Sequence, residues 1–276
     1  MKKIFWLFVF IGCTSAAMAQ KYVYEDVSSD KTPTTHNNKS NKIDVNKLRF
    51  GAYFAPTQAW MHPAASVSDD GHYHVSSQGS KTGYCWGLVA EYYFAQNYGI
   101  ATGFNVDLAG GKISSTANVP KLDTTQPNTL TKADMNYKLQ YLEIPFALKL
   151  RSDELPKSGM RVFGQIGLTA AFNISKKATY DISYKDASGT DQSVSGSNET
   201  LKGSLATAPI LIQLNVGAGV EYPITEKLYF FTALFFNNGF LPSAINPQNF
   251  DLGYKGSFTN PNTRLNSFAL RIGLYF

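Results

Sequence analysis

The feature that most limits the fold of this chain is a strict alternation of residue types near its C-terminus. Every second position there is apolar, in the series Phe268, Leu270, Ile272, Leu274 and Phe276. The positions between are small or polar, or carry the ring of a tyrosine. A period of two places the two series on opposite faces of a β-strand. The same alternation recurs in residues 83–94, 98–108 and 210–222, so the chain is predicted to fold mainly as β-structure.

Four further segments have weaker strand patterns: residues 48–60, 136–150, 160–175 and 228–238. The last of these is apolar on both faces, so the sequence does not indicate which face is buried. Together the eight segments are 11 to 16 residues long. Such strands are longer than the strands of ordinary soluble sheets and long enough to cross a bilayer at a tilt.

The links between these segments alternate in length. Residues 61–82, 114–135, 176–205 and 239–265 form long links, and residues 95–97, 151–159 and 223–227 form short ones. Outer-membrane barrels have short periplasmic turns and long extracellular loops. The sequence therefore predicts an all-β protein, an eight-stranded antiparallel up-and-down transmembrane β-barrel over residues 47–276. Both termini would be periplasmic. Aromatic residues beside the short links predict a periplasmic girdle of Tyr92, Tyr93, Phe94, Tyr98, Tyr222, Tyr229, Phe230, Tyr275 and Phe276.

The N-terminal residues indicate export. Lys2 and Lys3 precede an apolar run over residues 4–12, and Ala17-Met18-Ala19 fits a signal-peptidase site. We predict a signal peptide over residues 1–19 and a flexible, polar periplasmic extension over residues 20–46. Gly12-Cys13 offers a lipobox alternative that fits less well. Cleavage leaves Cys85 as the one cysteine and lowers the formal charge from +5 to +3, too little to indicate nucleic-acid binding.

Polar residues lie opposite the apolar faces and are expected to line the lumen. They are Arg49, Glu91, Asp107, Glu143, Gln165, Gln213, Asn215, Glu221 and Arg271. Eight strands enclose an interior that side chains fill, and a buried charge is costly unless it is paired. We therefore expect a lumenal ion-pair cluster of Arg49, Glu91, Glu143, Glu221 and Arg271, and no wide pore.

Three short motifs carry a family resemblance. Tyr141-Leu142-Glu143-Ile144-Pro145-Phe146 resembles the "YLEIP" strand of the PorT-like family of small outer-membrane β-barrel proteins of Bacteroidota. The opening Leu48-Arg49-Phe50-Gly51-Ala52-Tyr53 is similar to the first strand of that family. The ending at Phe276 resembles the terminal strand that the barrel-assembly machinery recognises. The resemblance implies an outer-membrane barrel with Phe276 as its assembly signal. The best-known member of that family is an accessory of type IX protein secretion.

Three functions remain open on the sequence: a non-enzymatic structural or accessory barrel, a narrow porin or transporter, and an envelope enzyme. His72 and His74 could form a weak metal site with Asp69 and Asp70, but a solvated polar loop is the preferred interpretation. We expect no catalytic residues, no metal and no cofactor. The expected partners are outer-membrane lipid and lipopolysaccharide, the barrel-assembly machinery and proteins of a secretion system, and no nucleic acid.

Overall fold

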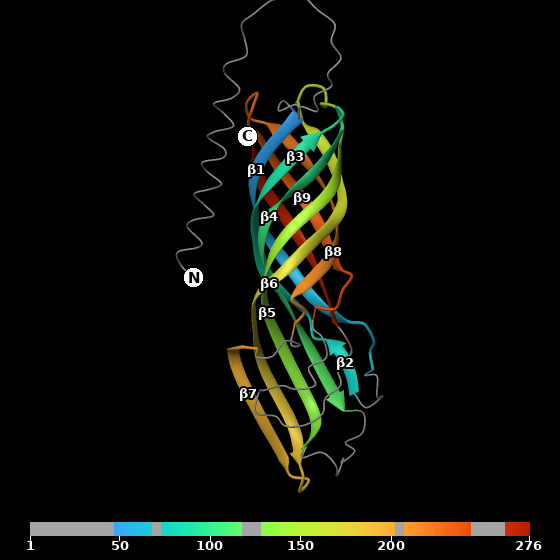
Figure 1. The fold of residues 1–276 in the computed structure, drawn as a ribbon, viewed down its shortest axis with the longest axis vertical. Coiled ribbons are helices and arrows are strands. Elements are labelled where there is room, and N and C mark those ends of the chain that lie inside the picture. The colour runs from blue at the N-terminus through green and yellow to red at the C-terminus, as the bar shows by residue number, and fades with distance from the viewer. Residues whose placement is uncertain (1–46, 68–72, 118–127, 202–206, 244–262) are drawn as a thin grey trace, which may run out of the picture. The chain divides into compact units, whose positions relative to one another are not determined.

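A computed structural model of the chain describes residues 47–67, 73–117, 128–201, 207–243 and 263–276. The predicted signal peptide and the predicted extension at 20–46 lie outside these residues and stay predictions. The described part forms one antiparallel sheet of ten strands (Figure 1). They are β1 (Leu48–Pro63), β2 (Tyr73–Ser77), β3 (Ser80–Tyr93), β4 (Tyr98–Ala117), β5 (Asn128–Arg151), β6 (Arg161–Asp186), β7 (Asp191–Thr200), β8 (Ile210–Pro223), β9 (Tyr229–Gly239) and β10 (Thr263–Tyr275).

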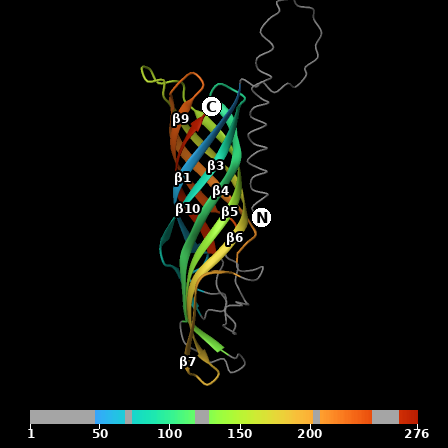
Figure 2. The ribbon, with the colours of Figure 1, turned by 90° about the vertical axis from the view of Figure 1, so that its left-hand side faces the viewer.

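Eight of these strands close into a ring in the order β1, β3, β4, β5, β6, β8, β9 and β10, and β10 pairs back with β1. Figure 2 shows the same barrel from the side. Each of the eight predicted strands is a strand of this ring, so the predicted fold class is confirmed. Among the described residues, no helix is long and apolar enough to cross a membrane.

The ring has two distinct ends. The short turns at 94–97, 152–160 and 224–228 lie at one end, together with the start of β1 and the end of β10. We call this the turn end and the opposite one the loop end. The backbone amide of Phe276 donates to the carbonyl of Phe50 over 2.8 Å, so the last residue is tied to the first strand.

Side chains of the ring alternate between lipid-facing and lumenal positions. Leu270, Ile272 and Leu274 of β10 are exposed on the outside, and Ala269 and Arg271 are buried inside. The structure also resolves the phase of β9, which the sequence left open. Phe231, Ala233, Phe235 and Asn237 point inward, and Leu234 is exposed. Polar residues therefore fill the lumen while apolar residues form the outer wall, as the alternation predicts.

The lengths predicted for three strands were wrong. β4, β5 and β6 continue beyond the ring into residues predicted as the loops 114–135 and 176–205. β2 pairs with β4 and β7 pairs with β6 there. These parts form a five-stranded sheet in the order β2, β4, β5, β6 and β7, which we call the extension. The pairing of β5 with β6 shifts between Gln140 and Tyr141, with Ile174 of β6 as the extra residue, at the point where the two strands leave the ring. Bulges bend a strand and increase its twist, which suits this departure.

The extension reverses the polarity of the two faces. Ile113, Met135, Leu139 and Ile182 are buried on its inner face. Its outer face carries charged and hydroxyl residues such as Lys112, Ser114, Thr116, Lys132 and Lys138. A strand that leaves lipid for water must expose polar groups where it had exposed apolar ones. The apolar outer face therefore ends with the ring, although the strands do not.

The predicted girdle was partly wrong. Phe94, Tyr98, Tyr222 and Phe276 are exposed near the turn end as predicted, but Tyr93 and Tyr275 are buried in the lumen. They occupy the inward-facing positions of β3 and β10, where the Tyr275 ring joins the interior packing and the Tyr93 hydroxyl donates to Glu91. A second aromatic group lies toward the loop end on the outer face, where the rings of Trp60, Phe236 and Phe268 pack with centroids 5.1 to 6.2 Å apart.

Candidate functional site

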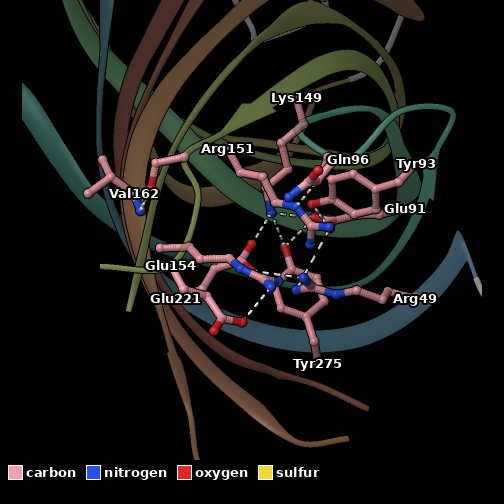
Figure 3. Close-up of polar contacts among 12 residues, drawn as sticks. Arg49, Glu91, Tyr93, Gln96, Lys149, Arg151, Glu154, Val162, Glu221 and Tyr275 are labelled. Carbon is pink, nitrogen blue, oxygen red and sulfur yellow. Dashed lines mark hydrogen bonds and ion pairs between the residues drawn. The ribbon is translucent and has the colours of Figure 1, made fainter. Parts of the chain in front are cut away.

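A charged cluster crosses the lumen near the turn end. Its members come from five strands: Arg49 from β1, Glu91 from β3, Lys149 from β5, Glu221 from β8 and Tyr275 from β10. Figure 3 shows these side chains converging on one another. Each lies on the inward-facing series of its strand and within a few residues of the strand end. The ring therefore brings together groups that are up to 226 positions apart in sequence.

Lys149 lies at the centre of this cluster and has no exposed side-chain surface. Its ammonium group lies 2.6 Å from Oε1 of Glu91 and 2.5 Å from Oε1 of Glu221. It also lies 3.1 Å from the hydroxyl of Tyr275 and 3.9 Å from the centroid of the Phe163 ring. Three hydrogen bonds and a ring face thus replace the water that a buried ammonium group would otherwise need.

Arg49 supplies the second positive charge. Its Nη1 donates to Oε2 of Glu221 over 2.8 Å, and its Nη2 lies 3.9 Å from Oε2 of Glu91. The guanidinium lies 4.1 Å from the ring centroid of Tyr275 and 5.1 Å from that of Tyr229. Aromatic faces attract cations, and Arg is the cation that stacks best on them.

Both carboxylates are satisfied as well. The Tyr93 hydroxyl donates to Oε2 of Glu91 over 2.9 Å, and the Tyr275 hydroxyl donates to Oε1 of Glu91 over 2.5 Å. Two cations therefore face two carboxylates, and the cluster carries no net charge. Removing a single member would leave an unpaired charge in the lumen, which is far costlier than the intact cluster.

The lumen is also occupied toward the loop end. β3 ends at Ser80, opposite Trp60, and beyond that point β1 packs directly on β4. A Cβ atom added to Gly111 would lie 2.5 Å from the backbone nitrogen of Met61 and 2.6 Å from its Cγ. Only glycine permits this close approach. Buried apolar side chains, among them Met61, Leu139, Leu211 and Leu265, fill the interior around it.

Comparison with known proteins fits this architecture. Residues 40–247 match the family described as "Outer membrane protein beta-barrel domain". The chain belongs to this family. Three solved barrels are similar to this outer-membrane protein in structure. Neisserial surface protein A is 14% identical with a TM-score of 0.39, and the match covers 83% of this chain and 96% of that one.

The Pseudomonas aeruginosa outer membrane protein OprG is 14% identical with a TM-score of 0.38, and the match covers 83% of this chain and 93% of OprG. The Yersinia pestis attachment invasion locus protein Ail is 11% identical with a TM-score of 0.34, covering 83% and 97% of the two chains. No curated protein matches the outer-membrane barrel.

Not all five residues predicted for the lumenal cluster meet. Arg49, Glu91 and Glu221 lie together, whereas Glu143 and Arg271 lie nearer the middle of the barrel. There the Arg271 guanidinium lies 3.9 Å from the ring centroid of Phe235 and 4.7 Å from that of Tyr53. Asn105 donates to Oε2 of Glu143 over 3.5 Å. Arg271 interacts electrostatically with both Glu143 and Asp107.

The predicted lumenal cluster omits Lys149, although the sequence carries a signal for it. Within residues 136–150, the apolar series is Leu142, Ile144, Phe146 and Leu148, which leaves Lys149 on the opposite face together with Glu143. A charged residue two positions from the end of a lipid-crossing strand resembles an interfacial lysine, and this hides its lumenal role. Tyr93 and Tyr275 were missed for a similar reason, because an aromatic residue at a strand end resembles a girdle residue.

The remaining candidates lie apart from the cluster. Phe276 follows β10 at the turn end, with its side chain on the outside. His62 lies on β1 and His74 on β2, and both side chains are exposed. His36 and His72, together with Asp69 and Asp70, lie outside the described residues. The part of the chain that the structure describes contains no group of three or more residues able to hold a metal ion.

Proposed function

We propose that this outer-membrane barrel is a non-enzymatic structural or accessory component whose lumen is filled by side chains. The charged cluster carries the proposal. Arg49, Glu91, Lys149 and Glu221 hold four different strands across the lumen through contacts of 2.5 to 3.9 Å. A lumen held shut in this way leaves the loops, the extension and the N-terminal segment as the parts that can bind partners.

The proposed orientation has the turn end in the periplasm and the loop end outside the cell. The short turns at one end and the extension at the other support it. Labelling tests it in intact cells with a membrane-impermeant maleimide on an Ala187→Cys variant. Ala187 is exposed in the turn between β6 and β7, and Cys85 is buried and gives an unlabelled background. Labelling of intact cells is expected, and labelling only after lysis would contradict the orientation.

Accessory function in protein secretion, of the type IX kind, is supported by the resemblance of residues 141–146 and of the first strand to the PorT-like family. Chemical crosslinking in intact cells tests it, with the full chain, a chain lacking residues 20–46, and a chain in which Asp186–Asp191 is replaced by a shorter turn. Loss of a crosslinked secretion component from one truncated chain is expected. An unchanged set of partners in both would exclude these segments as the binding parts.

Enzymatic activity is the less favoured function. The exposed His62 and His74 lie on different strands, away from the buried carboxylates of the cluster. Lipase and protease assays test it. We expect no activity in the wild type and none in a variant with His62, His72 and His74 replaced by Gln. Activity that disappears on replacement would overturn the proposal.

A further inference from the structure

Four lysines from four adjacent strands lie at the loop-end boundary of the outer wall. They are Lys81 of β3, Lys112 of β4, Lys138 of β5 and Lys177 of β6, and we call them the lysine row. Lys138 lies directly opposite Lys177, and Lys112 lies opposite Asn136. The Lys81 ammonium reaches the same place, because it donates to Oδ1 of Asn136 and to the carbonyl of Tyr137, both over 2.9 Å.

The lysine row has no counter-charge in the part of the chain that the structure describes. Among the described residues, no carboxylate lies within 4.0 Å of any of its four ammonium groups. Lys112 and Lys138 are close enough to Lys81 to repel its charge. Lys138 and Lys177 are directly opposite each other, and like charges in this arrangement destabilise a sheet. An anion bound from outside the protein would remove this repulsion.

The row lies where the lipid-facing wall ends. The outer apolar residues stop at Leu108 on β4, Leu142 on β5 and Ile174 on β6, and the lysines follow. From Leu150 to Leu142, the apolar stretch of β5 extends about 26 Å along the strand, or about 20 Å along the membrane normal at the usual tilt. The lysines therefore lie at the level where lipid head groups meet the protein.

A groove with polar and apolar lining continues from the row onto the outer face of the extension. It has a volume of about 490 Å³, and its lining includes Lys112, Ser114, Thr116, Asp134, Asn136 and Asp181. Lys112 belongs to both the groove and the row, and Asn136 binds Lys81. Hydroxyl, amide and carboxylate groups in one shallow groove can donate to and accept from the hydroxyls of a sugar.

We propose that the lysine row and this groove bind the phosphorylated glycolipid of the outer leaflet, with phosphate at the lysines and sugar in the groove. The proposal rests on the orientation given above, because only an outward-facing loop end meets that leaflet. Charge-assisted hydrogen bonds to phosphate suit a set of ammonium groups that face no carboxylate of the described residues. The position at the edge of the apolar wall favours a lipid head group over free phosphate, because the acyl chains would pack on Leu142 and Ile174.

Native mass spectrometry of the full chain in detergent tests the proposal by titration with diphosphorylated lipid A, the same lipid without phosphates, and inorganic phosphate. The Lys138→Gln/Lys177→Gln variant should bind diphosphorylated lipid A about 10- to 30-fold more weakly than the wild type. The Lys157→Gln/Lys227→Gln variant is the matched control, because it loses the same charge from two exposed turn-end positions. A Thr116→Val variant probes the groove and should bind lipid A more weakly without loss of folding.

Equal weakening in both double variants, or no weakening in the first, would overturn the proposal. Binding of inorganic phosphate as tight as that of lipid A would assign the row to a free anion and would also overturn it. Dephosphorylated lipid A should bind weakly to the wild type and to the lysine variant alike. A wrong orientation would give a different result. The Ala187→Cys variant would then be labelled only after lysis, while lipid binding in detergent would persist.

Discussion

The Lys149 ammonium lies 2.5 Å from the Glu221 carboxylate, and neither side chain is exposed. Lys149 belongs to β5 and Glu221 to β8, and these strands are separated in the ring by β6. A buried ion pair therefore joins two strands that share no backbone hydrogen bonds. Together with Arg49 and Glu91, it fills the lumen near the turn end.

A Lys149→Met variant is predicted to lose about 3–5 kcal/mol of stability, because two buried carboxylates would then share Arg49 alone. Urea unfolding in detergent, followed by the gel shift of heated and unheated barrel, measures the loss. Lys227→Met is the control, since Lys227 is exposed at the turn end. Adding Glu221→Gln to Lys149→Met should recover part of the stability. No recovery would mean that the pair is not coupled as described.

Gly111→Ala is predicted to destabilise the barrel by about 1–3 kcal/mol, because the new methyl group would overlap Met61. Gly164→Ala provides the matched control, since the nearest atom to a Cβ there is 4.0 Å away. The same urea unfolding experiment compares the two. Equal stability of the two variants would show that β1 and β4 do not pack as closely as described.

Phe276→Ala is predicted to reduce assembly into the outer membrane without changing the pairing of β1 with β10, which uses the backbone of Phe276. Phe276 is 61% exposed. Phe94→Ala removes a similarly exposed ring, 49% exposed near the same end, and should assemble normally. The amount of folded barrel in the outer-membrane fraction measures the assembly of each variant. Equal amounts for both variants would remove the special role of the last residue.

The turn between β6 and β7 is predicted to loosen in acid. Hydrogen bonds from Ser188 and the Thr190 amide lower the pKa of Asp186 below its ordinary value of 3.8. A lowered carboxyl pKa stabilises the turn above about pH 4, and this stabilisation is lost as the pH falls below that value. The protection factors of the Ser188 and Thr190 amides, measured by hydrogen exchange and corrected for its intrinsic pH dependence, should therefore fall in acid. In an Asp186→Asn variant, this pH dependence should disappear, and its persistence would contradict the assignment.

Much of the ring was predictable because lipid imposes one rule along the whole strand. The outer positions must be apolar, so the series from Phe268 to Leu274 and from Ile210 to Val216 gives both the strand and its phase. The outer positions of β9 are apolar as well, but its inner positions include Phe231 and Phe235. The sequence of β9 therefore shows no alternation between apolar and polar residues. Its phase depends on packing: Phe235 occupies space that Gly217 leaves open on the neighbouring strand.

The extension was not predictable from that rule because its solvent changes. Lys112 and Lys138 end the apolar outer series, although Ile113 and Leu139 continue an apolar inner one. A search for the inverted pattern after each apolar stretch would find it. The members of the charged cluster were predictable only in part. Whether Lys149 and Glu221 meet depends on how far the strands are staggered around the closed ring, and the sequence pattern does not give this stagger. Alternation gives the face of a residue and not its height in the lumen.

Planar-bilayer recording tests the central claim, that side chains close the lumen, most directly. The purified wild-type barrel is predicted to insert without steady conductance. A variant carrying Arg49→Ala, Lys149→Ala and Arg271→Ala is also predicted to show none, because Met61 and its buried neighbours still fill the loop end. Steady conductance of the wild-type barrel that survives Arg271→Ala and Lys149→Ala would contradict a plugged lumen and favour the narrow pore.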